Sequence, residues 1–154
     1  MQLAQKNIKI TRMDDDAINI VRKLENVLLD FPQIKLDTSH VLHAGMYART
    51  LTIPKGVVAT GAFIKIPTVL IVQGHCKIYI GDSTTDLIGY NVIPASANRK
   101  QAVYACEDTS VTMIFATNAK SVEEAEMEFT DEFSSLMSNK DLANNKYITT
   151  GADK

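Results

Sequence analysis

Residues 34 to 117 constrain the fold most, because short runs rich in β-branched and aromatic residues follow one another there without an intervening helical pattern. Turn-forming segments separate these runs at residues 53–56, 81–84, 94–98 and 107–110. Closely spaced strands of this kind are typical of a sandwich or a closed barrel. The strands are predicted near residues 40–44, 46–53, 61–66, 68–73, 75–80, 86–89, 91–94, 100–106 and 109–117.

An amphipathic helix is predicted before the strands, over about residues 15–30. Asp14, Asp15 and Asp16 stand at its start, where carboxylates accept from open amide groups and favour the helix dipole. Pro32 ends it. The apolar side chains recur every three or four residues and so form one stripe, made of Ala17, Ile20, Val21, Leu24, Val27, Leu28 and Phe31.

A second amphipathic helix is predicted over residues 121–137. Ser121 and Glu124 have the spacing of a capping box. The apolar stripe consists of Val122, Ala125, Phe129, Phe133 and Leu136. The acidic side chains, which we interpret as a solvated face, are Glu123, Glu124, Glu126, Glu128, Asp131 and Glu132.

The chain of 154 residues fits a single domain with one hydrophobic core. Within it we distinguish an N-terminal arm (1–13), a helix with the β-barrel (14–120), and a helix with a polar tail (121–154). The tail from Ser138 onwards is expected to be mobile by itself.

Bulk composition argues against several classes of partner. The net charge of −2 gives no bias toward nucleic acid or an anionic membrane, so neither is expected as a partner. No apolar run is long enough to span a bilayer, and residues 1–16 lack the apolar block of a signal peptide. Cys76 and Cys106 are far apart in the sequence and are interpreted as reduced, buried thiols of a cytosolic protein.

Two amphipathic helices and the open edges of a small jelly roll both need to be covered. Packing of the helices on the barrel covers their stripes, and pairing of two copies about a twofold axis is another way to do so. We therefore expect a homo-oligomer, a dimer in its simplest form and a higher assembly as the alternative.

Residues 53–74 and 89–99 resemble the two sequence motifs of the cupin superfamily of double-stranded β-helix barrels. In the first motif, Gly56 and Gly74 take the places of the outer glycines, while Ala62 and Ile64 fall where the family has two metal-binding histidines. Pro67 or Thr68 falls near the glutamate position. In the second motif, "GYNVIPASANR", Pro94 is one residue early, Ser96 takes a glycine position and Arg99 takes the histidine position.

A narrower resemblance, covering roughly residues 43–117, is to small cupin-like proteins of unassigned role that bacteriophages encode. It is carried by residues 46–65 and 89–109. Members of this group tend to have histidines where this chain has Ile64 and Cys106. The resemblance implies an all-β, cupin-like jelly-roll barrel with flanking helices, and a location in the host cytoplasm or in the virion.

No metal and no other cofactor is expected. A divalent ion needs three or four N, O or S donors that converge, and alanine and isoleucine side chains donate nothing. His75 and Cys76 point to opposite faces of a strand, so they do not bind one ion together. His40 and His43 also face opposite ways if their segment is a strand.

Cations and hydroxyl groups remain as candidate ligand-binding residues: Arg49, Thr60, Arg99, Lys100 and Tyr104. Together they would bind a phosphate or carboxylate through charge-assisted hydrogen bonds. The alternative is ordinary, with Arg49 paired to an acid and Lys100 solvated. Which side chains face the barrel interior near Arg99 stays open, because a shift of one residue in register reverses the answer.

Three functions follow as hypotheses. The first is a non-catalytic, phage-encoded protein that binds a small anionic molecule, such as a nucleotide signal of host defence. The second is a virion accessory or host-protein-binding oligomer without a small-molecule ligand. The third, ranked last, is a metal-independent isomerase that uses a histidine or tyrosine acid–base pair, with Tyr47, Tyr79, Tyr90 and Tyr104 as candidates.

Overall fold

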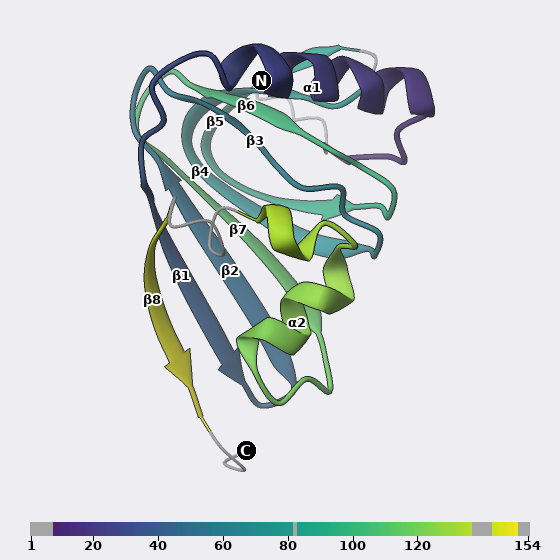
Figure 1. The fold of residues 1–154 in the computed structure, drawn as a ribbon, viewed down its shortest axis with the longest axis vertical. Helices are drawn as coiled ribbons and strands as arrows, with labels where there is room; N and C mark the ends of the chain where they lie inside the picture. The colour runs from purple at the N-terminus through teal and green to yellow at the C-terminus, as the bar shows by residue number, and fades with distance from the viewer. Residues whose placement is uncertain (1–7, 82, 137–142, 151–154) are drawn as a thin grey trace, which may run out of the picture.

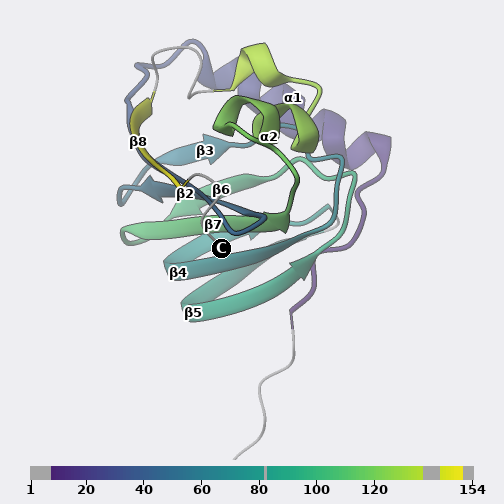
Figure 2. The ribbon, with the colours of Figure 1, turned by 90° about the horizontal axis from the view of Figure 1, so that it is seen from below.

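The computed structural model describes residues 8–81, 83–136 and 143–150, and Figure 1 shows how they are arranged. A curled sheet of eight strands forms one wall of the molecule. Two helices lie on the same side of that sheet, as the view from below shows (Figure 2). None of the described helices is long and apolar enough to cross a bilayer.

Helix α1 spans Asp15–Leu28, close to its predicted range. The Asp14 carboxylate accepts a hydrogen bond from the Ala17 amide at 2.8 Å, which explains where the helix begins. The predicted stripe is wrong in part. Ala17 and Val21 are buried, but Ile20, Val27 and Phe31 are more than half exposed. The helix packs on the barrel through a different face, which includes Ile18, a residue outside the predicted stripe.

The strands are β1 (Leu36–His43), β2 (Met46–Ile53), β3 (Val58–Thr60), β4 (Thr68–Tyr79), β5 (Thr84–Ala95), β6 (Ala102–Ala105), β7 (Thr109–Ala116) and β8 (Ala143–Thr149). Their order in the sheet is β3-β6-β4-β7-β2-β1-β8, and β5 pairs with the free side of β4. All these pairings are antiparallel except β1 with β8, which is parallel.

Two glycines explain why the predicted strand breaks at residue 74 and between 89 and 91 are wrong. Gly74 in β4 and Gly89 in β5 lie opposite each other and have φ angles of +139° and +81°. Without a Cβ they bend the two strands while the ladder continues, so four predicted strands become two long ones that curl (Figure 1). Residues 61–66 do not form a strand either, apart from one bridge between Ile64 and Arg99.

The C-terminal tail also differs from the prediction. Residues 143–149 form β8, which pairs with β1 along its whole length, whereas residues 138–142 and 151–154 lie outside the described part of the chain. The polar composition of β8 hid this strand, because a parallel edge strand is held by its backbone ladder and buries few of its own side chains. Ala143 is its buried member.

Helix α2 covers Val122–Phe129 only and is shorter than predicted. The Ser121 hydroxyl accepts from the Glu124 amide at 3.1 Å, so the predicted N-terminal cap is present. The helix stops because Thr130 is extended and its hydroxyl accepts from the Glu132 amide at 3.1 Å, which starts a turn. A short 3₁₀ turn, η1 (Phe133–Ser135), follows.

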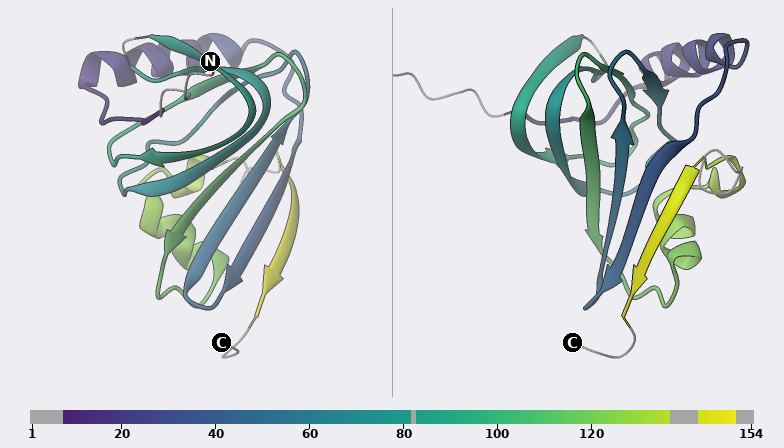
Figure 3. Two further views of the ribbon diagram at one scale, coloured as in Figure 1. Left: turned by 180° about the vertical axis from the view of Figure 1, so that it is seen from behind. Right: turned by 90° about the vertical axis from the view of Figure 1, so that its left-hand side faces the viewer.

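The core lies between the inner face of the sheet and the two helices. Tyr47 of β2, Phe115 of β7 and Phe129 of α2 contact one another through their rings, which places α2 over the inner face of β2 and β7. Val21 of α1 packs in a smaller cluster with Ala102 of β6. The outer face of the sheet is free of both helices (Figure 3, left).

Candidate functional site

At the positions that the cupin resemblance assigns to histidine ligands, this chain has Ala62, Ile64, Arg99 and Cys106. Among the described residues no cluster of three or more His, Cys, Asp or Glu side chains is present. Ile64 and Ala62 are half-buried and pack against the core. Arg99, at the histidine position of the second motif, donates from Nη2 to Thr68 Oγ1 at 2.7 Å, and Thr68 lies near the glutamate position of the first. A guanidinium and a hydroxyl therefore face each other there.

Arg99 is buried, with 1% of its surface exposed, and is held by neutral groups. Its Nη1 donates to the carbonyl oxygens of Ser96 at 2.8 Å and Ile66 at 3.3 Å, and Nη2 lies 3.8 Å from the Met113 sulfur. Burial lowers the pKa of Arg99 to about 10. The Nε atom is buried without a hydrogen-bond partner among the described residues. Arg99 is thus a buried cation compensated by dipoles and by no described carboxylate.

Lys100 belongs to a different cluster, which fastens α1 to the barrel. Its Nζ donates to the Gly61 carbonyl at 2.8 Å and lies 3.1 Å from Glu25 Oε2. The Thr60 hydroxyl donates to the same Glu25 oxygen at 3.0 Å. The expectation of a solvated Lys100 is therefore wrong, because the side chain is 1% exposed and paired with acids.

Glu132 closes this cluster from the other side. Its Oε2 accepts from the Phe63 amide at 3.0 Å and lies 3.5 Å from Lys100 Nζ, while Arg22 donates to Oε1 at 2.8 Å. Burial by itself would raise the pKa of Glu132, but the hydrogen bonds from Phe63 and Arg22 and the charges of Lys100 and Arg22 together lower it. The sequence predicted that Glu132 lies on a solvated acidic face, and the structure shows that this prediction is wrong for Glu132.

Arg49 pairs with an acid, as one of the two sequence alternatives states. Its Nη1 donates to Glu126 Oε2 at 2.6 Å, and the two side chains are 9% and 4% exposed. The guanidinium also stands over the Phe129 ring, 5.6 Å from its centroid. Glu126 comes from α2, so the predicted solvated acidic face is wrong at this residue too. Its carboxylate neutralises a cation on the inner face of the sheet.

The five candidate residues do not converge on one site. Thr60 and Lys100 meet at Glu25, Arg99 contacts Thr68, and Arg49 binds Glu126 on the inner face of the sheet. Tyr104 is 42% exposed on β6, opposite Val58 and Lys77 in the neighbouring strands. Three of the five thus already contact carboxylates of the protein itself.

A buried polar group that the sequence did not reveal involves His40. Its Nδ1 lies 2.7 Å from the Tyr47 hydroxyl and its Nε2 lies 2.8 Å from Asn145 Oδ1. The ring also stacks on Tyr147 of β8 at 4.7 Å between centroids. Burial lowers the pKa of His40 and raises that of Tyr47 to about 12. The signal for His40 was its place on the inner face of β1, but two of its partners, Asn145 and Tyr147, are more than 100 residues away in the sequence.

The side chains of the two other histidines and the two cysteines have few polar contacts among the described residues. His75 is 4.0 Å from Asp86 near the surface, and Cys76 is buried on the opposite face of β4, as predicted. Both cysteines are free; burial raises the pKa of Cys76 to about 11, and Cys106 is half-buried. His43 lies 2.6 Å from the Thr150 hydroxyl at the exposed end of β1.

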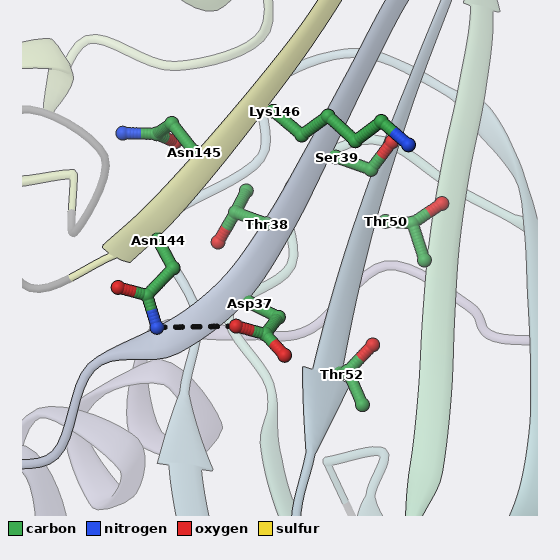
Figure 4. Close-up of a pocket in the computed structure, with 8 residues that line it drawn as sticks. All are labelled: Asp37, Thr38, Ser39, Thr50, Thr52, Asn144, Asn145 and Lys146. Carbon is green, nitrogen blue, oxygen red and sulfur yellow. Dashed lines mark hydrogen bonds between the residues drawn. The ribbon is translucent and has the colours of Figure 1, made fainter.

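Arg49, Arg99 and Lys100 line neither of two surface depressions among the described residues. The first, of about 570 Å³, lies along β8, β1 and β2 and is open and polar (Figure 4). Within it Asn144 donates to Asp37 at 3.1 Å. The second lies on the exposed side of α1. The three cations in the interior are thus not the walls of either depression.

Comparisons with known proteins give likenesses of fold. No family model matches the chain, and no curated protein matches it. Among solved structures, it is similar to a cupin superfamily protein from Desulfitobacterium hafniense, with 15% identity, coverage of 60% of this chain and 86% of that chain, and a TM-score of 0.45.

Two further structures are similar at the same level. The plu4264 protein from Photorhabdus luminescens has 16% identity, coverage of 77% and 90%, and a TM-score of 0.47. An RmlC-like cupin from Methanocaldococcus jannaschii with a double-stranded β-helix fold has 12% identity, coverage of 54% and 81%, and a TM-score of 0.45. The curled sheet and its strand order make this chain an all-β jelly roll with flanking helices.

Proposed function

We propose that this protein is a non-catalytic, phage-encoded oligomer that acts through its outer surface, as a virion accessory or by binding a host protein in the host cytoplasm. The phage part of the proposal is supported by the resemblance of residues 46–65 and 89–109 to small cupin-like phage proteins. The proposal that the protein acts through its outer surface is supported by the pairing of cations in the barrel with carboxylates of the same chain.

The observation that carries the proposal is the pairing of barrel cations with carboxylates from the flanking helices. Glu126 of α2 binds Arg49, and Glu25 of α1 binds Lys100. An anionic ligand at either cation would have to displace a carboxylate that the chain already supplies. Such a ligand gains little, because the protein's own acid is held in place without the entropy cost of association.

Native mass spectrometry of the protein purified from infected cells tests this proposal. We expect masses that are whole multiples of the 17.0 kDa chain, with no additional small-molecule mass. Quantification of the chain in purified virions then distinguishes a virion accessory from a protein that binds a host protein. Only a virion accessory is present in a fixed ratio to the capsid. A stoichiometric small molecule that survives purification would contradict the proposal.

A second candidate function, capture of a small anion, is favoured by one residue. Arg99 is buried without a described carboxylate partner, and its Nε is unsatisfied. A buried guanidinium of this kind would be stabilised by a phosphate or carboxylate that reached it.

Thermal shift against inorganic phosphate, nucleotides and cyclic dinucleotides tests capture. A ligand at about 100 times its dissociation constant adds about 2.7 kcal/mol, which corresponds to roughly 5–10 °C for a domain of this size. The Arg99→Lys variant retains the charge but loses the planar donors, so it should lose the shift. Absence of a shift over the whole panel would count against capture.

A further inference from the structure

We infer that the outer face of the sheet is a docking surface for a second copy of this chain. The inference rests on the proposed function, because it names the surface and the partner of an oligomer that works from its exterior. It begins with a row of side chains that crosses the sheet.

The cross-strand register places six apolar residues side by side on the outer face, one on each of six neighbouring strands. The row runs Pro94, Val69, Ile114, Ala48, Val41 and Ile148, from β5 through β4, β7, β2 and β1 to β8. Val69 is 44% and Ile148 is 46% exposed. In an antiparallel sheet with one face on the core, the other face is expected to be polar, so an unbroken apolar row is unusual.

The apolar surface widens toward β5. Val92 and Ile71 lie side by side in the next row, and Tyr90 and Ile88 follow on β5. Ile88, Tyr90 and Val92 are 69%, 64% and 56% exposed. On the other side of the row, Met46 of β2 is 50% exposed. These residues with the six-residue row form what we call the outer apolar band.

No described helix covers this band. Helix α2 packs on the opposite face through Phe129, and α1 packs beside β6 through Val21 (Figure 3, left). β5 also has one side without a paired strand, where the single described contact is a bridge between Ile10 and Ala95. A long apolar edge strand of this kind is a site where chains associate.

Charge argues for a second copy over a charged partner. The row contains no ionisable side chain. The nearest on the outer face are Lys146, at the β8 end of one neighbouring row, and His43, opposite Met46 in the other. A twofold axis along the row would set the row of one copy against the same row of the other. It would carry Lys146 of the second copy to the opposite side of the row, so the two lysines would not meet. The patch is therefore compatible with itself.

The size of the face also fits. Six strands about 4.8 Å apart, with three rows of outward side chains, give a face of roughly 600 Å² before side-chain relief is counted. A standard interface covers about 800 Å² on each partner, so this face is large enough for a modest homodimer.

Sedimentation equilibrium of the full chain tests the inference, with two valine variants that are matched in kind and exposure. Val69→Glu places a charge in the row, whereas Val27→Glu places the same charge on the exposed side of α1, where Val27 is 55% exposed. We expect a dimer of the 17.0 kDa chain for the unmodified protein and for Val27→Glu. Val69→Glu should weaken the dimer at least tenfold, or about 1.4 kcal/mol.

A second matched pair guards against misfolding of Val69→Glu, whose position is in a central strand. Ile148→Lys changes the edge strand β8 and Ile20→Lys changes α1, at residues that are 46% and 54% exposed. Circular dichroism reports whether each variant is folded. A monomeric unmodified protein at about 100 μM, or equal dimerisation of Ile148→Lys and Ile20→Lys, would overturn the inference. A retained small molecule would contradict the proposed function and leave these masses unaffected, so the two failures are distinguishable.

Discussion

The buried ion pair between Arg49 and Glu126 offers the sharpest test of how the helices close the barrel. Its atoms are 2.6 Å apart and its side chains are 9% and 4% exposed, so both charges are withdrawn from water. Replacing Glu126 by Gln keeps the shape of the side chain but removes its charge. The buried Arg49 cation then loses the counter-charge of this carboxylate, and we expect a loss of about 3–5 kcal/mol in the free energy of unfolding.

The loss should reflect the cost of keeping the Arg49 charge buried after Glu126 is neutralised, and not the net contribution of the ion pair. If both residues are replaced, by Arg49→Met with Glu126→Leu, no charge remains buried. The double variant is expected to lie within about 2 kcal/mol of the unmodified protein, or to exceed its stability. The double variant also loses the contact of Arg49 with the Phe129 ring, which costs about 2 kcal/mol. This cost opposes the stability gained by removing two buried charges.

Urea denaturation followed by circular dichroism measures these differences, and the chain contains a matched control. Lys65 and Asp131 are also 2.6 Å apart, but their side chains are 37% and 81% exposed. Asp131→Asn should cost about 0–1 kcal/mol, because water already screens that pair. If Glu126→Gln costs no more than Asp131→Asn, burial does not govern the Arg49 pair and the reasoning is refuted.

Two further perturbations follow from the glycine bend and from His40. Gly74→Ala should cost about 2–4 kcal/mol in urea denaturation, because its Cβ would lie 2.5 Å from the Asp108 carbonyl at a φ of +139°. Gly89→Ala, with open space around it, should cost only about 1–2 kcal/mol, and equal costs would argue against steric contact as the cause. The pKa of His40 is lowered below 6.5 in the folded protein, so the unfolded chain binds its proton first as the pH falls. Stability should therefore drop below about pH 6.5 by up to 1.4 kcal/mol per pH unit and His40→Gln should flatten that slope, whereas an unchanged slope would exclude His40 as its source.

The elements that could be predicted from the sequence are those whose cause is local. Helix α1 begins where Asp14 caps it, and α2 begins at Ser121, since both caps depend on residues within a few positions. The β-rich run from 34 to 117 predicted a barrel through composition and spacing alone. Gly74 misled the prediction because a glycine in a strand indicates either a break or a bend, and the deciding contact with Asp108 comes from a distant turn.

The candidate site was harder to predict, because its partners come from distant segments. Arg49 and Glu126 are 77 positions apart, and His40 and Asn145 are 105 positions apart. Neither distance leaves a periodic signal in the sequence. β8 was missed for the same reason: its mostly polar sequence becomes a strand only where β1 presents a free edge.

These long-range pairs share a feature that bears on function. The carboxylates that reach Arg49 and Lys100 come from α2, from α1 and from the segment that follows α2, while the cations stand on β2 and just before β6. Carboxylates of the helices therefore occupy the positions at which an external anion would bind Arg49 or Lys100. To exchange Glu126 for an external anion, α2 would have to withdraw Phe129 from Tyr47 and Phe115 as well. Burial of one such aromatic side chain is worth about 1.5–3 kcal/mol, in addition to the cost of separating the ions. An external ligand would have to supply all of this before it gained any affinity. The outer apolar band requires no such exchange, because Val69, Val92 and Ile148 are exposed already. For that reason we propose that this protein acts through its outer face.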